Sequence, residues 1–369
     1  MRYYIIAGER SGDLHGANFI KALKQYDKNA EIRCWGGDLM REAGGDLVMH
    51  YDELAVMGFL EVLKNIRKLR GFMKFCQQDL LSFAPDVLIM IDYGGFNLRM
   101  AKFAKSHNIK TFYYISPKVW AWKQSRALKI KAVVDKMFVI LPFEKSFFRK
   151  FDYEVDYVGN PLLDAVREFQ PDPDFKANND LTDKPIIAIL PGSRRQEIDN
   201  ILTSMMSIVD SFPDYHFVVA GISTLPPDIY QQINEKPSIK IIYDRTYDLL
   251  SNAEAAIVTS GTATLETALF EVPQVVCYKT SAFTYAIAKR LVKVAYISLV
   301  NLIADQEVVK ELIQSDLNQK NLEKELNDII ISGRKREGQL KGYKRIKEIL
   351  GNEKASENLA RLVTKYLAE

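Results

Sequence analysis

The sequence is short of cysteine and of long apolar runs. Cys34, Cys76 and Cys277 are scattered and form no CxxC pair, which favours a reducing compartment without disulfides. The longest apolar candidate, residues 283–303, is interrupted by basic side chains and does not fit a membrane-spanning helix. The N-terminus reaches Glu9 too soon for a signal peptide. We therefore expect a soluble, cytoplasmic protein.

Histidine clusters and nucleotide-binding fingerprints are also missing. The four histidines are far apart in the sequence and HExxH does not occur, so no metal site is predicted. Some metal-dependent sugar transferases use an Asp-x-Asp pattern. The single one in this sequence, at residues 172–174, lies among prolines in a turn-rich stretch and is not expected to bind a metal ion. G-x-G-x-x-G and the P-loop are absent, which argues against a dinucleotide oxidoreductase and a P-loop NTPase. No cofactor is expected.

The sequence does contain a large apolar fraction with balanced charge. Hydrophobic residues make up 47% of the 369 residues, which is enough for two or three domains with cores of their own. Lys and Arg total 50 against 47 Asp and Glu, and this net charge of +3 does not favour nucleic acid as a partner.

Short apolar runs alternate with helix-length segments, which is the pattern of parallel βα units. The polar residues 170–180 look like a linker between two such series. The predicted fold is therefore α/β, with two doubly wound Rossmann-like domains facing across a cleft, at residues 1–165 and 166–340. Terminal helices at 341–369 either cross back onto the first domain or exchange between subunits of a homodimer. The predicted strands are Tyr3–Ala7, Ile32–Trp35, Val87–Ile91, Thr111–Ile115, Met137–Leu141, Val155–Val158, Ile186–Leu190, His216–Ala220, Ile241–Tyr243, Ala255–Val258 and Gln274–Tyr278.

Ligands of such sheets bind beyond the carboxyl ends of the strands, and one loop there has the features of a diphosphate-binding turn. Ser260-Gly261-Thr262 follows an apolar strand and opens a helical segment, so backbone N–H groups and the positive end of the helix dipole face outward. Glu266, one turn further on, is placed to accept hydrogen bonds from a sugar or ribose diol. An ordinary strand-to-helix turn with a solvated glutamate gives the same pattern.

A second loop of the same kind lies in the same predicted domain. Pro191-Gly192-Ser193-Arg194 ends a strand, and Ser193 with Gln196 fits the S-x-x-Q capping box of a new helix. Arg194 suits bidentate contact with a phosphate. One such loop is a weak signal, but two in one domain indicate a single anionic ligand held between them.

Two loops in the first half carry further candidates. Ser11 and Gly12 lie in a glycine-containing turn that lets a substrate approach the backbone, and His15 follows in the next helical turn. A tight turn and a partly buried histidine are the alternatives. Asp92 ends an apolar strand, and apolar walls there would raise its pKa toward that of a general base. The alternative is an aspartate that bonds the backbone of its own turn.

Residues 56–75 have the pattern of a basic amphipathic helix. Apolar residues keep helical spacing among interleaved basic ones, which suits an anionic membrane surface and equally a helix packed on its own sheet. The residues predicted to contact membrane or acyl chains are Met57, Phe59, Leu63, Ile66 and Leu69.

Taken together, these motifs resemble the lipid-A-disaccharide synthases, which are inverting glycosyltransferases of the GT-B type. The resemblance extends in order over most of the chain. The matching runs are Gly8–Asp13, Glu53–Gly58, Ile91–Asn97, Ser116–Trp122, Leu141–Lys145, Leu190–Arg194, Ser260–Glu266, Ala288–Lys293, Ser298–Leu302 and Val309–Leu312.

The resemblance implies a reaction in the synthesis of lipid A, the anchor of lipopolysaccharide in the Gram-negative outer membrane. UDP-2,3-diacylglucosamine is the donor and 2,3-diacylglucosamine 1-phosphate (lipid X) the acceptor, giving a β-1,6-linked disaccharide 1-phosphate and UDP. The resemblance also implies no metal ion, and a peripheral position on the anionic inner face of the cytoplasmic membrane. The first domain is then expected to bind the acceptor and the second the UDP-sugar.

The roles that follow are expectations for individual residues. Asp92 matches the family's catalytic aspartate and is expected to take the proton of the acceptor hydroxyl. The turns at Ser193 and Ser260–Thr262, with Arg194, are expected to stabilise the departing UDP. Glu266 is expected to hold the ribose. Asn301 matches a further family position near the nucleotide, in a role the sequence does not define.

Three positions depart from the family pattern. Gly94-Gly95 stands where the family often has Pro-Asp, which leaves Asp92 as the candidate carboxylate of its loop. Arg10 replaces a small residue and is predicted to add a contact to the acceptor phosphate. Gln306 stands where an arginine is common. Two other functions fit parts of the pattern: another GT-B enzyme on a non-lipid UDP-sugar, such as an epimerase, and a non-catalytic nucleotide-binding module.

Overall fold

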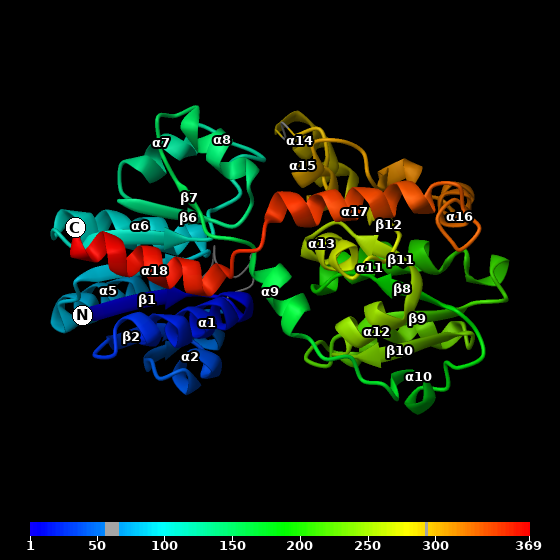
Figure 1. Ribbon diagram of the computed structural model, residues 1–369, viewed down its shortest axis with the longest axis horizontal. Coiled ribbons are helices and arrows are strands. Elements are labelled where there is room, and N and C mark those ends of the chain that lie inside the picture. Colours follow the sequence, from blue (N-terminus) through cyan, green and yellow to red (C-terminus); the bar gives the residue numbers. More distant parts are fainter. Residues whose placement is uncertain (56–65, 292–293) are drawn as a thin grey trace. The chain divides into compact units, whose positions relative to one another are not determined.

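The computed structural model describes residues 1–55, 66–291 and 294–369 (Figure 1). By their tertiary contacts these residues form two compact units. Unit 1 comprises Met1–Pro161 and Asn352–Glu369, and unit 2 comprises Leu162–Gly351. The predicted boundaries at 165 and 340 therefore differ from those of the units, because the long helix that ends at Leu350 packs within unit 2.

Unit 1 contains a seven-stranded sheet with the order β3-β2-β1-β4-β5-β6-β7. Every neighbouring pair in it is parallel. The strands are β1 (Arg2–Ala7), β2 (Glu31–Gly36), β3 (Asp46–His50), β4 (Val87–Ile91), β5 (Lys110–Tyr114), β6 (Lys136–Val139) and β7 (Asp156–Tyr157). The helices are α1 (Arg10–Tyr26), α2 (Asp38–Glu42), α3 (Tyr51–Ala55), α5 (Ile66–Phe83), α6 (Gly94–Ser106), α7 (Arg126–Lys131), α8 (Phe143–Arg149) and α18 (Ala355–Ala368).

Unit 2 contains a six-stranded parallel sheet with the order β10-β9-β8-β11-β12-β13. The strands are β8 (Ile186–Leu190), β9 (His216–Gly221), β10 (Ile239–Tyr243), β11 (Ala253–Thr259), β12 (Gln274–Tyr278) and β13 (Lys310–Ile313). The α-helices are α9 (Pro161–Glu168), α10 (Phe175–Asn178), α11 (Arg195–Met206), α12 (Thr246–Asn252), α13 (Thr262–Leu269), α14 (Ala282–Leu291), α15 (Leu299–Ala304), α16 (Gln319–Asn327) and α17 (Arg336–Leu350). Short 3-10 helices lie at Val209–Ser211, Pro227–Glu235 and Gln314–Asp316.

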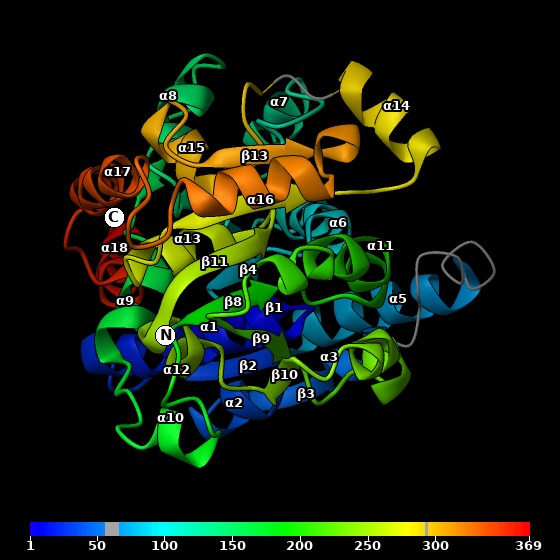
Figure 2. The same cartoon turned by 90° about the vertical axis from the view of Figure 1, so that its right-hand side faces the viewer.

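Helices cover both faces of each sheet, which explains the continuous apolar runs of the central strands. In β8, Ile187 and Ile189 belong to one hydrophobic cluster, whereas Ile186, Ala188 and Leu190 belong to another on the opposite face. On one face of this sheet α16 lies against β12 and β13 (Figure 2).

The C-terminal helix α18 completes the core of unit 1, where it runs along α1 (red in Figure 1). Leu359, Ala360 and Val363 are fully buried in the same cluster as β1. Burying such side chains contributes roughly 1.5–3 kcal/mol for each of the larger ones. Lys110 Nζ donates to the Tyr366 carbonyl at 3.2 Å and holds the end of the helix.

The strand order reverses once in each sheet, between β1 and β4 in unit 1 and between β8 and β11 in unit 2. Ligands of doubly wound sheets bind at the carboxyl ends of the strands at this switch point. The loops after these four strands are the ones that the sequence singled out. The topology thus brings the predicted loops together in pairs, one pair in each unit.

The predicted strands and the prediction of two Rossmann-like α/β domains are confirmed, with small shifts at the strand ends. β3 and β13 escaped prediction because they are short edge strands, partly exposed and rich in charge. The linker prediction for residues 170–180 is wrong. Phe175 there is 1% exposed in the core of unit 2, and Arg245 Nη2 donates to Asp172 Oδ2 at 2.8 Å. Within the described ranges, no helix is both long and apolar enough to cross a membrane.

Candidate active site

The loop after β8 in unit 2 turns on a glycine with positive φ. Gly192 has φ 113°, a conformation that favours glycine. A Cβ atom added there would lie 2.7 Å from Glu197 Oε2 and 3.2 Å from Thr259 Cγ2 at the end of β11. Gly192 therefore packs against the end of β11, from which the second predicted nucleotide loop starts, and Pro191 is buried.

The helix after this loop begins later than the capping-box pattern predicts. α11 starts at Arg195 with Arg194 as its extended N-cap, so Ser193 lies outside the helix and the predicted Ser193–Gln196 box does not form. Glu197 takes its place, because its carboxylate accepts from the Ser193 backbone N–H at 3.2 Å and from Arg194 Nη1 at 3.4 Å. An anion bound at this turn competes with Glu197 for these donors.

The loop after β11 leads into α13, which starts at Thr262 with Gly261 as its N-cap. Both donors of Ser260 are used inside the protein: its N–H bonds the Cys277 carbonyl at 3.0 Å and its hydroxyl the Ile297 carbonyl at 2.8 Å. Ser260 therefore fixes the turn, whereas the exposed first turn at Gly261 and Thr262 is the part that can face an anion.

Glu266 lies one turn into α13 and is half-buried. Burial raises the pKa of its carboxyl, against the lowering effect of the Tyr247 hydroxyl, which donates to Oε1 at 2.8 Å. Tyr247 comes from α12 and packs edge-on against Phe169. No pattern in the sequence indicated Tyr247, since nothing in the chain order relates it to α13.

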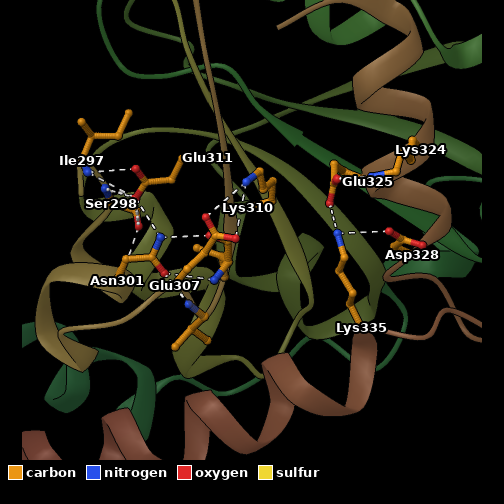
Figure 3. A network of polar contacts seen from close by, with 12 residues as sticks. Ile297, Ser298, Asn301, Glu307, Lys310, Glu311, Lys324, Glu325, Asp328 and Lys335 are labelled. Carbon is orange, nitrogen blue, oxygen red and sulfur yellow. Dashed lines mark hydrogen bonds and ion pairs between the residues drawn. The ribbon is translucent and has the colours of Figure 1, made fainter. Parts of the chain in front are cut away.

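Asn301 is fully buried and its amide is satisfied within the protein (Figure 3). Oδ1 accepts from the backbone N–H groups of Val308 and Val309 at 2.8 and 3.0 Å. Nδ2 donates to the Val309 carbonyl and to Glu311 Oε1, both at 2.9 Å. Asn301 thus joins the start of β13 to α15 and leaves no donor or acceptor pointing to a ligand.

Glu311 is the centre of the same network and was not predicted. Its carboxylate accepts from the backbone N–H groups of Ile297 and Ser298 and from the Ser298 hydroxyl (Figure 3). Because Ile297 also accepts from Ser260, the network runs from β13 to the turn after β11. The only signal in the sequence was its place in the matching run Val309–Leu312, which does not indicate this role.

In unit 1 the loops after β1 and β4 also touch. A Cβ atom added to Gly8 would lie 2.4 Å from the Tyr93 ring. Asp92 and Tyr93 have φ of 45° and 50°, which is rare for two consecutive residues other than glycine. The carbonyl of Asp92 accepts from the Tyr113 hydroxyl at 2.5 Å and from Asn97 Nδ2 at 2.8 Å, and these bonds hold the turn.

The side chain of Asp92 is exposed. The apolar walls expected around it are therefore absent, because the strained turn directs the residue out of the core. The preceding strand β4 is fully buried, and the sequence pattern does not show that burial ends at Ile91, directly before Asp92.

The candidates for the acceptor lie in the first turns of α1, which starts at Arg10. Arg10 and Ser11 are exposed, whereas Gly12 is buried, with a Cβ position 3.1 Å from that of Ala7. His15 is half-buried, its ring centroid 6.3 Å from that of Tyr114, and burial lowers its pKa to about 4. His15 is therefore neutral at pH 7.

Two buried carboxylates that the sequence did not single out support the loops of unit 1. Asp13 accepts from the backbone N–H groups of Gly37, Leu39 and Met40 and so caps α2. Glu144, fully buried at the start of α8, accepts from the Ser116 hydroxyl at 2.5 Å. Burial raises the pKa of Glu144 to about 7. Both belong to motifs of the family resemblance, which was the available signal.

The remaining predictions fall elsewhere. Met57, Phe59 and Leu63 lie outside the described residues, whereas Ile66 and Leu69 lie in the first turns of α5 and Leu69 is half-buried. Gln306 lines a cavity of about 500 Å³ with Lys335 and Arg345, at the amino end of β13 and thus away from the strand-end loops. Among the described residues, no group of three or more His, Cys, Asp or Glu side chains is arranged to hold a metal ion.

Comparison with known proteins decides the family. A family model described as lipid-A-disaccharide synthetase matches residues 3–364. The chain belongs to the lipid-A-disaccharide synthase family. A lipid-A-disaccharide synthase from Geobacter sulfurreducens is 37% identical over 376 residues, covering 100% of this chain and 98% of the relative. The chain is accordingly an enzyme, a glycosyltransferase of lipid A biosynthesis, and the predicted family is confirmed.

Solved structures agree on the fold. The UDP-GlcNAc 2-epimerase from Neisseria meningitidis bound to UDP-GlcNAc matches with a TM-score of 0.68 at 14% identity, covering 100% of both chains. A calicheamicin glycosyltransferase matches with a TM-score of 0.63 at 14% identity, covering 100% of this chain and 98% of that one. At these identities the likeness shows the GT-B class of two Rossmann-like domains and nothing of the substrate.

Proposed function

We propose that this enzyme transfers 2,3-diacylglucosamine from its UDP donor to lipid X and releases UDP with the β-1,6-linked disaccharide 1-phosphate. The observation that supports this is the position of the family's loops. In unit 1 the loops after β1 and β4 meet at the switch point, and in unit 2 those after β8 and β11 meet at the corresponding point. One pair suits the acceptor and the other the nucleotide.

In the proposed reaction the 6-hydroxyl oxygen of the acceptor bonds to the anomeric carbon as the bond from that carbon to UDP breaks. The attack comes from the face opposite to UDP, so the configuration inverts. The hydroxyl proton passes to the carboxylate of Asp92, which is exposed and hence accessible to a substrate hydroxyl. Tyr113 and Asn97 keep its turn in place through the backbone carbonyl.

The departing UDP gains negative charge, which unit 2 is proposed to stabilise. The open first turn of α13 at Gly261 and Thr262 contributes backbone N–H groups and the helix dipole. Arg194 contributes an accessible cation, since its side chain is 73% exposed. Glu266, with one oxygen held by Tyr247, accepts from the ribose hydroxyls. Asn301 acts indirectly, by fixing the network that ends at Ser260.

Arg10, Ser11 and Gly12 at the start of α1 are proposed to bind the 1-phosphate of lipid X. The exposed guanidinium and hydroxyl lie at the positive end of a 17-residue helix. His15, which is neutral at pH 7, is proposed to serve there as a hydrogen-bond partner rather than as a charge.

The site of action proposed for the enzyme is the inner face of the cytoplasmic membrane, bound peripherally through the segment that includes Met57, Phe59, Leu63, Ile66 and Leu69. Replacing Leu63 and Ile66 by Asp is expected to abolish association with liposomes; an unchanged distribution contradicts this contact. A homodimer is the assembly to be tested, by light scattering over a range of concentrations.

The Asp92→Asn variant tests the mechanism. Asparagine tolerates the positive φ of this position and keeps the side-chain shape, so UDP binding measured by calorimetry is expected to stay unchanged. UDP release in the presence of lipid X is expected to fall by a factor of about 10²–10⁴. Asp152→Asn is the matched control, since Asp152 is exposed and has φ 52°. Full activity of Asp92→Asn removes Asp92 from the mechanism.

The likeness to UDP-GlcNAc 2-epimerases supports one alternative, an epimerase acting on a UDP-sugar without an acceptor. The wild-type enzyme incubated with UDP-GlcNAc alone is expected to give neither UDP nor the 2-epimer. With UDP-2,3-diacylglucosamine, UDP is expected only when lipid X is added. Formation of the 2-epimer overturns the proposed transfer.

A further inference from the structure

One exposed surface of unit 1 combines an aromatic, an aliphatic and several basic side chains. Between Pro117 and Val134 the sequence contains no Asp or Glu. The exposed side chains of this stretch that we call the Trp122 patch are Lys118, Trp122, Lys123, Arg126, Leu128 and Lys129.

The apolar members of the patch face solvent next to cations. Trp122 is 39% exposed and Leu128 54% exposed, both large values for such side chains. Lys123 Nζ lies 4.9 Å and Arg126 Cζ 5.5 Å from the centre of the Trp122 ring. The buried residues of α7 are Ala127 and Ile130, so Leu128 lies on the outward side of that helix.

This exposure belongs to a well-anchored segment. The residues just before the patch are fixed in the core: Ser116 donates to Glu144, and the buried Trp120 packs edge-on against Phe143 with ring centroids 5.0 Å apart. Pro117 packs against the Asp92 turn, since a Cβ atom at Gly94 would lie 3.1 Å from its Cγ. The segment that leads into the patch is therefore anchored in the core and starts beside that turn.

Within the parts of the chain that the structure describes, the basic side chains of the patch have no carboxylate partner. Among the described residues, Lys118, Lys123, Arg126 and Lys129 form no ion pair. Their positive charge is thus available to an anionic partner.

Several basic residues of α17 differ in this respect, although Lys344 and Arg345 form no ion pair in the described parts of the chain. Arg336 pairs with Glu254 at 2.8 Å, and Lys347 pairs with Glu271 at 2.7 Å. A dense run of basic residues in the sequence therefore does not by itself indicate a free cationic surface, and the structure separates the two cases.

We propose that the Trp122 patch is a contact surface for an anionic lipid bilayer. Tryptophan favours the interface between headgroups and acyl chains, leucine adds apolar area, and unpaired lysine and arginine attract anionic headgroups. Single exposed apolar residues need no explanation, but here two of them lie among unpaired cations on a rigid support. The contact surface is formed by residues other than 56–75. It rests on the proposed function in one respect, that the acceptor is a lipid: the bilayer then presents its headgroups beside the Asp92 turn.

Vesicle co-sedimentation with the full chain tests the proposal. The vesicles are phosphatidylcholine alone and phosphatidylcholine with phosphatidylglycerol. The paired variant Lys123→Glu/Arg126→Glu is expected to lower binding to the anionic vesicles about tenfold. Trp122→Ser/Leu128→Ser is expected to lower binding to both kinds. The matched control is Lys341→Glu/Lys344→Glu on the exposed face of α17, which changes the net charge equally and is expected to leave binding within about twofold.

Transfer measured with both substrates dispersed in detergent separates this inference from the proposed function. Each patch variant is expected to keep wild-type UDP release there, because the patch touches the bilayer and not the reacting groups. Failure of the wild-type enzyme to release UDP overturns the proposed function. The vesicle experiment then decides the membrane contact of the patch by itself. Unchanged vesicle binding by both patch variants, or an equal loss in the α17 control, overturns the patch. The patch proposal is also overturned if Leu128→Ser dissociates a dimer while vesicle binding is unchanged.

Discussion

In unit 1 the loop after β4 passes through two non-glycine residues with positive φ, Asp92 and Tyr93, whereas in unit 2 the loop after β8 turns on Gly192. The first loop is held by side chains, the Tyr113 hydroxyl and the Asn97 amide, that bond its backbone. The second loop depends on a glycine. Because Gly192 has no side chain, Thr259 and Glu197 can pack closely against its backbone. Both loops lie at the switch point of their sheet, one after β4 and the other after β8, and they are stabilised in two different ways.

The difference matches the chemistry proposed for each unit. A base must be fixed at one position, and buried groups around unit 1 fix it by specific hydrogen bonds. A diphosphate needs backbone N–H groups that remain open, and glycine allows a ligand to approach them. Unit 1 should therefore lose stability when its buried carboxylates are removed. Unit 2 should be sensitive to any Cβ atom in its glycine turn.

Removing the carboxylate of Asp13 is expected to have the largest effect. Asp13 is 2% exposed and accepts three backbone hydrogen bonds, at 2.7, 3.1 and 3.2 Å. Asp13→Ala leaves these donors buried without a partner, which is expected to lower the free energy of unfolding by about 4 kcal/mol. Urea denaturation measures it. Asp38→Ala, which removes an exposed carboxylate paired with Arg41, is the control and is expected to cost below about 0.5 kcal/mol. A loss under about 1 kcal/mol for Asp13→Ala contradicts the supporting role.

The Glu144→Gln variant is expected to remove a pH dependence of stability. Burial raises the pKa of Glu144 to about 7 in the folded protein, above its usual value of 4.5. The folded state therefore binds the proton more tightly between pH 4.5 and 7, and the stabilisation present at low pH is lost as pH rises through 7. The wild-type free energy of unfolding should fall relative to that of Glu144→Gln by about 3 kcal/mol over this range.

Chemical denaturation at several pH values measures this difference. Glu154→Gln, at an exposed residue paired with Arg149, is the control and should keep the wild-type profile. Parallel profiles for wild type and Glu144→Gln would show that Glu144 does not titrate in this range.

The Gly192→Ala variant examines the glycine turn of unit 2. The φ of 113° is strained for alanine, and the new Cβ would lie 2.7 Å from Glu197 Oε2, so a loss of about 2 kcal/mol is expected. Gly338→Ala in α17 is the matched control, because its Cβ position has no heavy atom within 4 Å. There alanine should stabilise the helix by about 1 kcal/mol. Equal shifts of the two variants in urea denaturation contradict the comparison.

The smallest effect on stability, with a clear effect on binding, is expected for Arg194→Ala. Its side chain is 73% exposed, so the free energy of unfolding should change by less than about 0.5 kcal/mol. Loss of a charge-assisted phosphate contact should weaken UDP binding about tenfold by calorimetry. Arg195→Ala is the control, because Arg195 pairs with Asp228 instead. If both variants weaken UDP binding equally, the effect comes from the overall positive charge of the loop and contradicts a specific contact of Arg194 with the phosphate.

The sequence predicted the central strands because apolar runs buried on both faces leave a clear pattern. It also predicted the loops at their ends, since glycine and serine between strand and helix follow from local backbone geometry. It did not predict β3 and β13, whose edge positions leave them partly exposed. It misjudged residues 170–180, where turn residues surround a buried Phe175, because composition does not reveal what a turn packs against.

The functional residues divide in the same way. Asp92 could be named from its place after a strand, but its exposure could not, because positive φ at Asp92 and Tyr93 depends on Tyr113 and Asn97 from other elements. Asn301 could be named from its motif, but only the network with Glu311 shows that its amide is fully occupied within the protein.

The sequence by itself determined the fold class, the family and the loops at the switch points, because these depend on local periodicity and on motifs contiguous in the chain. The tertiary structure alone decided which charges are paired and which are free. Glu197 meets Ser193, Tyr247 meets Glu266, and the basic residues near Trp122 meet no carboxylate in the described parts of the chain. Except for the contact between Ser193 and Glu197, which are four residues apart, such pairings are set by distances in space between residues distant in sequence, and no local pattern carries that information.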